Sequence, residues 1–516
     1  MRGFFRRNQP LRTGDAPPAG RLAEPGSDAP PSALPATDWA TVGWLVGLAA
    51  AAVLIRWPFF GVPMITDEGG YAYVARHWTA QTRLYREIPF GRPEGIFLLY
   101  KLIFATLGGD IIAIRVFAAL YNAATTLALF GFARAVFGSR AAWISATAYA
   151  LLSSSPVIEG FTANAEIFTL LPLVLAAWAL WKQQWFWAGL LTAIATNLKP
   201  SGIEAGVLGL LWLAYTRPGW RALFGFGLGG LLGVAPSILH GLAIGWSHYW
   251  YAMVLMRREV YAPEVVALGA TLKRLWIGVI ATYAAWALPG VLFACAALHP
   301  LGRARAFALA WLFSTGVGMA LGVWWDAHFF LQLLPPLCFL TGVGALKVLG
   351  SRRRWIWATV ATAALALFAL RNLPFWTYDP LRTSWELYHR PGYVFSAPLA
   401  QYIRARTPPH EPIYVAFAEA ELYYLADRPA AVPEQLYYAV ARYSPRAFAK
   451  VVAALEQRVP ALVVVAQPPP SNRMSLAAFQ VLLSRGYVFE QRFGNLQVWR
   501  RKRPEELASA QRGHAS

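Results

Sequence analysis

Two adjacent carboxylates, Asp67 and Glu68, are the residues of this sequence whose type and spacing best fit chemistry. They begin the segment TDEGGYAYVARHW, residues 66–78. On a helix, Glu68, Tyr71 and Ala75 share one face, because side chains three or four positions apart are neighbours. A carboxylate placed there can take the proton of an attacking hydroxyl group. The alternative is structural, with Thr66 or Asp67 capping the helix, and one residue can serve both purposes.

A cation follows in the same polar stretch, at Arg92 in the segment FGRPEGIF, residues 90–97. The planar guanidinium of arginine suits a phosphate group, because its N–H donors match two phosphate oxygens at once. The alternative is an interfacial arginine, whose stem lies in lipid while its charged head reaches water. These side chains need elements that hold them at one place.

The composition shows what those elements are. Of the 516 residues, 57% are hydrophobic and only 14% are charged, whereas a soluble domain carries about a quarter of charged residues. The net charge of +20 does not indicate nucleic-acid binding, because such proteins place their charge on a polar, basic surface. Here the charges interrupt long apolar runs. This pattern is typical of a multispanning membrane protein.

About eleven apolar runs are long enough, or nearly so, to cross a bilayer, which takes roughly 20 residues per helix. They lie at residues 40–60, 113–136, 141–159, 163–181, 185–198, 203–216, 221–241, 275–297, 305–324, 328–346 and 355–373. Alternate breaks carry the basic residues: Arg134, Arg140, Lys182, Arg217, Arg221, Arg303, Arg305, Lys347 and Arg352 to Arg354. The positive-inside rule places these breaks and the N-terminus in the cytoplasm. An odd number of spans then places the C-terminal part outside.

The acidic residues of the membrane part sort to the opposite side. They are Asp67, Glu68, Glu87, Glu94, Asp110, Glu159, Glu166, Glu204, Glu259, Glu264 and Asp326. Each falls in an outward loop or near the outer end of a span. Because acidic residues contribute little to orientation, this sorting indicates function, and carboxylates at the edge of a membrane bundle are functional candidates.

The chain divides into four parts. Residues 1–38 are predicted to be a disordered cytoplasmic tail, 39–374 a transmembrane catalytic module, 375–505 an extracytoplasmic α/β domain and 506–516 a second disordered tail. In the α/β domain, residues 413–417 and 462–465 are predicted to be buried strands and residues 487–499 a hairpin. Segments near 395–406 and 445–457 are expected to be helical. The fold class is therefore an all-α polytopic membrane bundle with a small C-terminal α/β domain.

Several motifs together resemble a known family. The segments around Asp67 and Arg92 are similar to the first outer loop of GT-C-fold glycosyltransferases, and most similar to the protein O-mannosyltransferase and lipid A aminoarabinose transferase superfamily, which is like bacterial glycosyltransferase family 39. Further segments fit in order: TANAEIF at residues 162–168, NLKP at 197–200 and WDAHFFLQLLP at 325–335. The resemblance covers roughly residues 40–370 and implies the GT-C fold.

The resemblance also implies a function. Such enzymes transfer a sugar, with inversion, from a polyprenyl-phosphate-linked donor to a lipid, glycan or protein acceptor on the outer face of the membrane. Asp67 would be the base, and Glu68 would orient it or bind sugar hydroxyls. Arg92 and Lys199 would hold the phosphate. The substrate-binding set expected is Tyr71, Arg92, Asn164, Glu166, Lys199, Arg257, Arg258, His328 and Gln332.

Some of these residues have a second interpretation. Relatives commonly have Lys-Pro-Pro where this chain has Arg92-Pro93-Glu94, and the carboxylate of Glu94 either weakens phosphate binding or marks a different substrate. Arg257 and Arg258, together with His248 and Tyr261, belong to an outward loop at residues 242–274 and reach either the phosphate or lipid headgroups.

His328 is either a packing residue or a ligand. No cofactor and no metal ligand are assigned, although a divalent metal on Asp326 and Glu166 stays an alternative.

Two other classes of function compete with an enzyme. A polytopic transporter or flippase would show internal repeats or polar residues near mid-membrane, and the sequence has no clear repeat. A non-catalytic membrane scaffold would leave the pair Asp67 and Glu68 without a purpose. The expected partners are the lipid-linked donor, the acceptor and membrane lipids, without nucleic acid. The expected location is a bacterial inner membrane, with the C-terminal domain in the periplasm or outside the cell.

Overall fold

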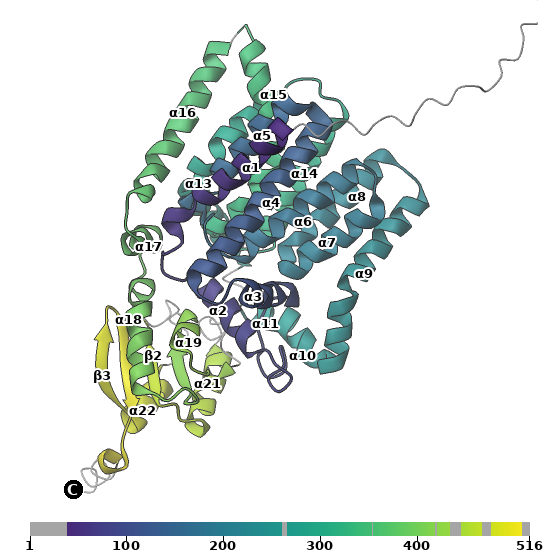
Figure 1. The fold of residues 1–516 in the computed structure, drawn as a ribbon. Coiled ribbons are helices and arrows are strands. Elements are labelled where there is room, and N and C mark those ends of the chain that lie inside the picture. Colours follow the sequence, from purple (N-terminus) through teal and green to yellow (C-terminus); the bar gives the residue numbers. More distant parts are fainter. Residues whose placement is uncertain are drawn as a thin grey trace, which may run out of the picture. The chain divides into compact units, whose positions relative to one another are not determined.

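A computed structural model describes residues 39–260, 266–352, 354–417, 420–433, 445–466 and 476–507 (Figure 1). The tail predicted at residues 1–38, and all but the first two residues of the tail predicted at 506–516, lie outside the described residues, as does Tyr261. Two compact units are distinguished, Met1–Trp44 and Leu45–Ser516. Of the first unit, only the start of the first helix is described.

Eleven helices of the described chain coincide with the eleven predicted apolar runs. They are α1 (Trp39–Leu54), α4 (Ile111–Phe137), α5 (Ser139–Leu152), α6 (Ala165–Trp181), α7 (Trp185–Leu198), α8 (Glu204–Thr216), α9 (Trp220–Ile244), α13 (Leu268–Ala297), α14 (Arg303–Ala320), α15 (Leu334–Gly350) and α16 (Arg354–Asn372). Six segments of the described chain that contain α1, α4, α9, α13, α15 and α16 are long and apolar enough to cross a membrane. The predicted all-α membrane bundle is confirmed.

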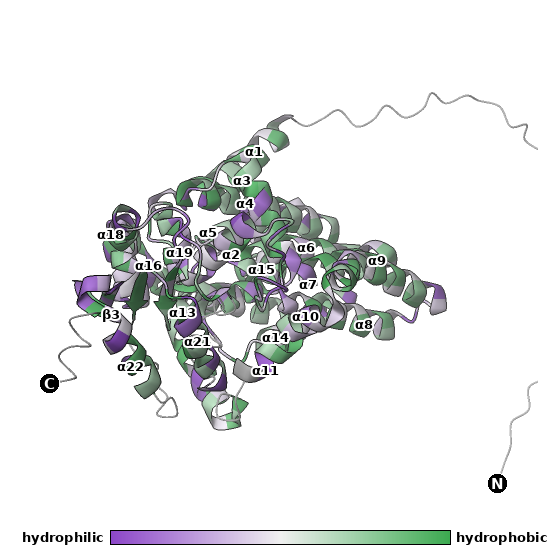
Figure 2. Ribbon diagram, turned by 90° about the horizontal axis from the view of Figure 1, so that it is seen from below, coloured by the Kyte–Doolittle hydropathy of each residue, from purple (hydrophilic) through white to green (hydrophobic). Residues whose placement is uncertain are grey.

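Small residues let neighbouring helices of the bundle approach closely. A Cβ atom on Gly189 of α7 would lie 2.0 Å from the carbonyl oxygen of Phe226 in α9, and one on Gly229 of α9 would lie 2.0 Å from that of Phe186 in α7. Such backbone contact between helices is typical of membrane bundles, where packing rather than a hydrophobic driving force holds helices together. In Figure 2, the green colour of hydrophobic residues predominates along the helices of the bundle.

The first long loop of the bundle forms two further helices, α2 (Thr66–His77) and α3 (Glu94–Thr106). Asp110 ends the loop by capping α4, since its carboxylate accepts hydrogen bonds from the backbone N–H groups of Ile112 at 2.9 Å and Ala113 at 3.0 Å. The loop that follows α9 carries α10 (Trp246–Trp250), a π-helical turn (Tyr251–Leu255) and α11 (Met256–Val260).

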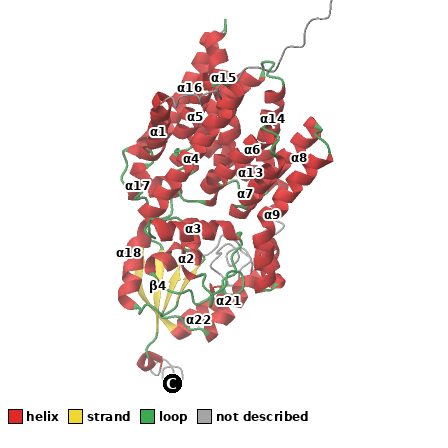
Figure 3. Ribbon diagram, turned by 45° about the vertical axis from the view of Figure 1, so that its right-hand side comes forward, coloured by secondary structure: helices red, strands yellow, loops and turns green. Residues whose placement is uncertain are grey.

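The C-terminal domain places helices around one small sheet (Figure 3). Its helices are α17 (Pro380–Tyr388), α18 (Pro391–Arg406), α19 (Glu421–Ala426), α21 (Pro445–Gln457) and α22 (Ala477–Gly486). The strands β1 (Ile413–Ala416), β2 (Leu462–Val465), β3 (Tyr487–Phe493) and β4 (Leu496–Arg501) form a sheet of order β1-β2-β4-β3. β1 and β2 are parallel, with Ile413 opposite Leu462, and the other pairs are antiparallel. The predicted small C-terminal α/β domain is confirmed.

Candidate active site

The start of α2 is fixed by Glu68 rather than by a capping side chain of Thr66 or Asp67. Ile65 is the N-cap residue, and its backbone N–H donates to Glu68 Oε2 at 3.1 Å. A carboxylate in the first turn is also favoured by the partial positive charge of the helix N-terminus. The sequence therefore predicted the helix correctly, and the alternative in which Thr66 or Asp67 caps it is wrong.

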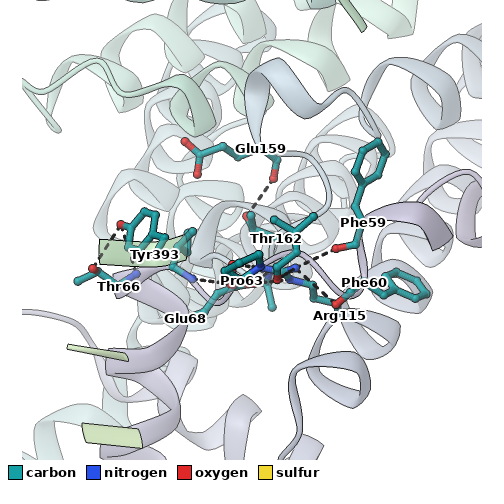
Figure 4. A network of polar contacts seen from close by, with 12 residues as sticks. Phe59, Phe60, Pro63, Thr66, Glu68, Arg115, Glu159, Thr162 and Tyr393 are labelled. Carbon is teal, nitrogen blue, oxygen red and sulfur yellow. Dashed lines mark hydrogen bonds and ion pairs between the residues drawn. The ribbon is translucent and has the colours of Figure 1, made fainter. Parts of the chain in front are cut away.

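Glu68 belongs to a fully buried ion pair with Arg115 of α4 (Figure 4). Arg115 donates from Nε to Glu68 Oε1 at 3.1 Å and from Nη2 to Oε2 at 2.9 Å, and the backbone N–H of Ala163 donates to Oε1 at 2.8 Å. Arg115 Nη1 also donates to the carbonyl oxygen of Phe59 at 2.8 Å. Because every one of these groups is satisfied within the protein, Glu68 joins the first loop, α4 and the start of α6.

Asp67 points to a different set of partners and is only half-buried. The side-chain amide of Asn164 donates to Asp67 Oδ2 at 3.3 Å. Asn164 is the N-cap of α6, where its Oδ1 accepts from the backbone N–H of Ala165 at 2.8 Å. Asp67 therefore keeps an accessible carboxylate while one of its oxygens is held by the amide that begins α6.

Tyr71 connects Asn164 to the predicted phosphate-binding arginine. Its hydroxyl group donates to Asn164 Oδ1 at 3.4 Å and accepts from Arg92 Nε at 3.2 Å. Burial raises the pKa of Tyr71, so the phenol keeps its proton and acts as a donor. The carbonyl oxygen of Arg92 accepts from the hydroxyl group of Tyr85 at 2.7 Å, which fixes the backbone of this loop.

Lys199, Glu166 and His328 form a second group, from the end of α7, the first turn of α6 and the segment before α15. Lys199 and Glu166 are a buried ion pair, and the Lys199 ammonium group lies 3.9 Å from the centre of the Phe329 ring. His328 Nε2 lies 3.5 Å from Glu166 Oε1, and His328 Nδ1 lies 3.3 Å from Glu159 Oε1. The lysine predicted to hold phosphate thus already has a carboxylate partner.

Glu159 reaches His328 from a strained backbone. Its φ angle is +56°, a left-handed conformation that costs about 1–2 kcal/mol for residues other than glycine. Its carbonyl oxygen accepts from the hydroxyl group of Thr162 at 2.9 Å (Figure 4). Strain of this kind persists where surrounding contacts determine the conformation, and it concentrates at functional sites.

The remaining predicted residues take three different positions. Arg257 Nη2 donates to the carbonyl oxygen of Gly91 at 3.0 Å, which attaches α11 to the loop of Arg92, whereas Arg258 is exposed. Gln332 is buried and donates to Glu204 Oε2 at 3.0 Å.

Glu94 faces α9, where Ser237 Oγ donates to its Oε2 at 3.0 Å and His240 Nδ1 lies 2.9 Å from its Oε1. Its carboxylate therefore joins α3 to α9.

In chemical terms the arrangement offers an accessible carboxylate, two cations from separate loops and several polar groups that hold them. Within the described ranges, no group of three or more His, Cys, Asp or Glu residues is arranged to hold a metal ion.

Sequence reasoning missed Arg115 as the partner of Glu68. The available signal was an arginine inside the apolar run 113–136, because a charge within a membrane segment needs a partner.

The architecture defines the class of protein: this is a multi-pass membrane protein with the GT-C fold. A protein-family model, described as dolichyl-phosphate-mannose-protein mannosyltransferase, matches residues 92–240. No curated protein sequence matches the chain.

Two solved structures of one protein share the fold. ArnT from Cupriavidus metallidurans bound to undecaprenyl phosphate is similar with a TM-score of 0.59 and 16% identity, over 89% of this chain and 98% of that one. The apo state of the same protein gives a TM-score of 0.55 at 16% identity and the same coverage. The apo oligosaccharyltransferase of Archaeoglobus fulgidus is less similar, with a TM-score of 0.46 and 13% identity over 83% of this chain and 70% of that one.

Proposed function

We propose that this protein is a membrane glycosyltransferase. It transfers a sugar, with inversion, from a polyprenyl-phosphate-linked donor to a lipid, glycan or protein acceptor on the outer face of the membrane. The observation that carries the proposal is the continuous set of contacts from Asp67 through Asn164 and Tyr71 to Arg92. An accessible carboxylate and a cation are thereby joined at one site. A similar fold has been solved with undecaprenyl phosphate bound, which supports a lipid phosphate as the donor's carrier.

The proposed reaction needs one base and one phosphate site. Asp67 takes the proton of the acceptor hydroxyl group as its oxygen attacks the anomeric carbon of the sugar. The bond from that carbon to the phosphate oxygen breaks on the opposite side, and its electron pair leaves with the phosphate. Arg92 and Lys199 stabilise the negative charge that develops there. Attack opposite to the leaving group accounts for inversion.

The other residues have supporting roles in this proposal. Glu68 holds the start of α2 from inside the bundle through its ion pair with Arg115, so it positions Asp67 and does not contact the sugar. Asn164 and Tyr71 orient Asp67 and Arg92. Lys199 must share its charge between Glu166 and the arriving phosphate, and His328 beside Glu166 compensates for that sharing.

The other three predicted substrate contacts have separate roles in this proposal. Arg257 supports the loop of Arg92 through Gly91, and the exposed Arg258 remains available to the phosphate or to headgroups. Gln332 acts through Glu204. We place the protein in a bacterial inner membrane with its C-terminal domain outside, as the distribution of basic residues predicts.

The test uses the Asp67→Asn protein, purified and reconstituted in liposomes. Binding of polyprenyl phosphate should be retained, and transfer of a labelled sugar should fall by about a hundredfold or more, because general base catalysis contributes about 10²–10⁴-fold. Asp379→Asn is the matched control, since Asp379 is an exposed aspartate that caps α17 and asparagine caps a helix equally well, so it should transfer normally. Normal transfer by Asp67→Asn would refute the mechanism. Movement of the lipid-linked donor or of a small solute across the membrane of liposomes that contain no acceptor would instead support a transporter.

The sugar and the acceptor can be identified in cells. Mass spectrometry of lipid and glycan fractions, from cells with and without the gene, should reveal one species that loses a defined sugar mass when the gene is absent. Cells that express Asp67→Asn should match those without the gene. An unchanged set of glycans and lipids would argue against transfer to either class and would direct attention to protein acceptors.

A further inference from the structure

Thr66, the residue that directly precedes Asp67, is bound by the C-terminal domain. Its hydroxyl group donates to Glu421 Oε2 of α19 at 3.1 Å and accepts from the hydroxyl group of Tyr393 of α18 at 3.3 Å. Thr66, Tyr393 and Glu421 are all buried. The contact joins residues 355 positions apart in the sequence. One end of α2 is therefore held by a part of the chain that has no place in the membrane bundle.

The same helix touches α19 through its backbone. A Cβ atom on Gly69 would lie 2.2 Å from Glu421 Cα and 2.8 Å from its backbone nitrogen. No side chain fits between these elements, so α19 rests directly on the first turn of α2. Because the close atoms belong to the backbone of Glu421, a rotamer change cannot make room for a larger residue at position 69. A larger residue at position 69 therefore requires α2 and α19 to move apart.

Further contacts extend this interface along the whole of α2. The hydroxyl group of Tyr73 accepts from the backbone N–H of Ala430 at 2.9 Å. Arg76 pairs with Asp427 at 2.9 Å, and its guanidinium group lies 4.0 Å from the centre of the Tyr424 ring. From its first turn to its last, α2 is therefore held between the bundle and the C-terminal domain.

We propose that the C-terminal domain completes the active site by setting the position of Asp67, with Thr66, Gly69 and Glu421 as positioning residues. This inference rests on the proposed function, in which Asp67 is the base. Asp67 stands between Glu68, which the bundle holds through Arg115, and Thr66, which the C-terminal domain holds. Its carboxylate therefore depends on two separate supports.

The position of Asp67 matters for the rate because a base must lie within hydrogen-bond reach of the hydroxyl group it deprotonates. An error of about 1 Å in such a position costs about a hundredfold in rate. The contact of Asp67 with Asn164 is 3.3 Å, already long for a hydrogen bond, so it does not hold the carboxylate alone. A change at Thr66 or Gly69 should therefore lower kcat while the donor, which binds at the cations, keeps its KM.

The experiment compares full-length variants in liposomes. Thr66→Val removes the hydroxyl group without changing the size of the side chain, and Thr66→Ser restores it. Gly69→Ala forces α2 and α19 apart. The matched controls are Thr106→Val, which removes a hydroxyl group from an exposed residue of α3, and Gly269→Ala, where a Cβ atom meets nothing within 4 Å. The measurements are kcat, the KM for the donor, and hydrogen exchange of the backbone N–H groups of α2.

We expect kcat to fall about tenfold or more in Thr66→Val and Gly69→Ala, with the KM for the donor unchanged, and to recover in Thr66→Ser. Hydrogen exchange of the backbone N–H groups in the first turn of α2 should be faster in Thr66→Val and Gly69→Ala than in the wild-type protein, and unchanged in both controls. Normal kcat in both variants beside an active wild-type protein would overturn the inference, whatever the exchange rates are. Absence of transfer by the wild-type protein would instead refute the proposed function, so the two failures are distinguishable.

Discussion

The two neighbours of Asp67 are held in contrasting ways. Glu68 is held by charge, through an ion pair with Arg115 in which both side chains are fully buried. Thr66 is held by a neutral hydroxyl group and by the close packing of Gly69 on Glu421. A buried charge that loses its ion-pair partner costs about 3–5 kcal/mol, whereas a hydrogen bond from a hydroxyl group to a carboxylate contributes about 1.5–3 kcal/mol. The bundle therefore supplies most of the stability of α2, and the C-terminal domain adjusts its position.

The largest loss of stability is expected when the charge of Arg115, the support that the bundle gives to α2, is removed. Arg115→Ala leaves Glu68 buried without its cation, which should lower the free energy of unfolding by about 3–5 kcal/mol. Thermal unfolding in detergent measures the loss. The double variant Arg115→Ala with Glu68→Ala should recover part of it, because no unpaired charge remains. An unfolding midpoint for Arg115→Ala equal to that of the wild-type protein would contradict the ranking of the two supports.

The next largest loss of stability is expected where Gly69 of α2 packs on Glu421 of the C-terminal domain. Gly69→Ala should lower the free energy of unfolding by about 1–3 kcal/mol, the usual cost of inserting a methyl group into a packed core. The loss should be smaller than that of Arg115→Ala and should appear in the same thermal assay, with Gly269→Ala as the neutral reference. If Gly69→Ala were the more damaging of the two, the C-terminal domain would be the principal support of α2.

A smaller effect is expected at the exposed end of this interface. Arg76 and Asp427 pair at 2.9 Å, but their side chains are 38% and 60% exposed. Such pairs contribute at most about 1 kcal/mol and weaken in salt. Asp427→Asn should therefore leave the unfolding midpoint nearly unchanged, with any difference disappearing at high salt. A large loss that persists in salt would show that this pair, and not Gly69, anchors α19.

The smallest expected effect is a dependence on pH at the end of α2. Burial lowers the pKa of His77, so the unfolded chain binds a proton more readily than the folded protein. The contribution of His77 to stability is present above the ordinary histidine pKa of about 6.5 and is lost as the pH falls through and below that value. His77→Gln should make the unfolding midpoint less sensitive to pH between about 7.5 and 5.5. An unchanged pH dependence would exclude this contribution.

The helices could be predicted because their cause is local. An apolar run of the right length satisfies its own backbone hydrogen bonds in lipid, and this requirement located all eleven helices. Short continuous apolar runs located β1 and β2 in the same way, and a turn signal within residues 487–499 located the hairpin of β3 and β4. Asp67 and Arg92 were noticed because a charged residue in an apolar chain is rare.

The partners of these residues could not be predicted, because they come from distant parts of the chain. Arg115 is 47 positions from Glu68, and Lys199 is 33 from Glu166. The Glu94 carboxylate was expected to affect Arg92, its near neighbour in sequence, yet it binds Ser237 and His240 on α9. A hydroxyl group such as that of Thr66 gives no pattern at all, since its importance depends on what lies opposite.

The contact between Thr66 and Glu421 also has a consequence for the order of events during synthesis. Thr66 leaves the ribosome 355 residues before its partner, and at about 5–20 residues per second the delay is roughly 20 to 70 seconds. Arg115, only 47 residues behind Glu68, arrives within roughly 10 seconds at the same rates. The helix that carries the proposed base is therefore seated by the membrane bundle first. It receives its final alignment only when the last quarter of the protein has been made.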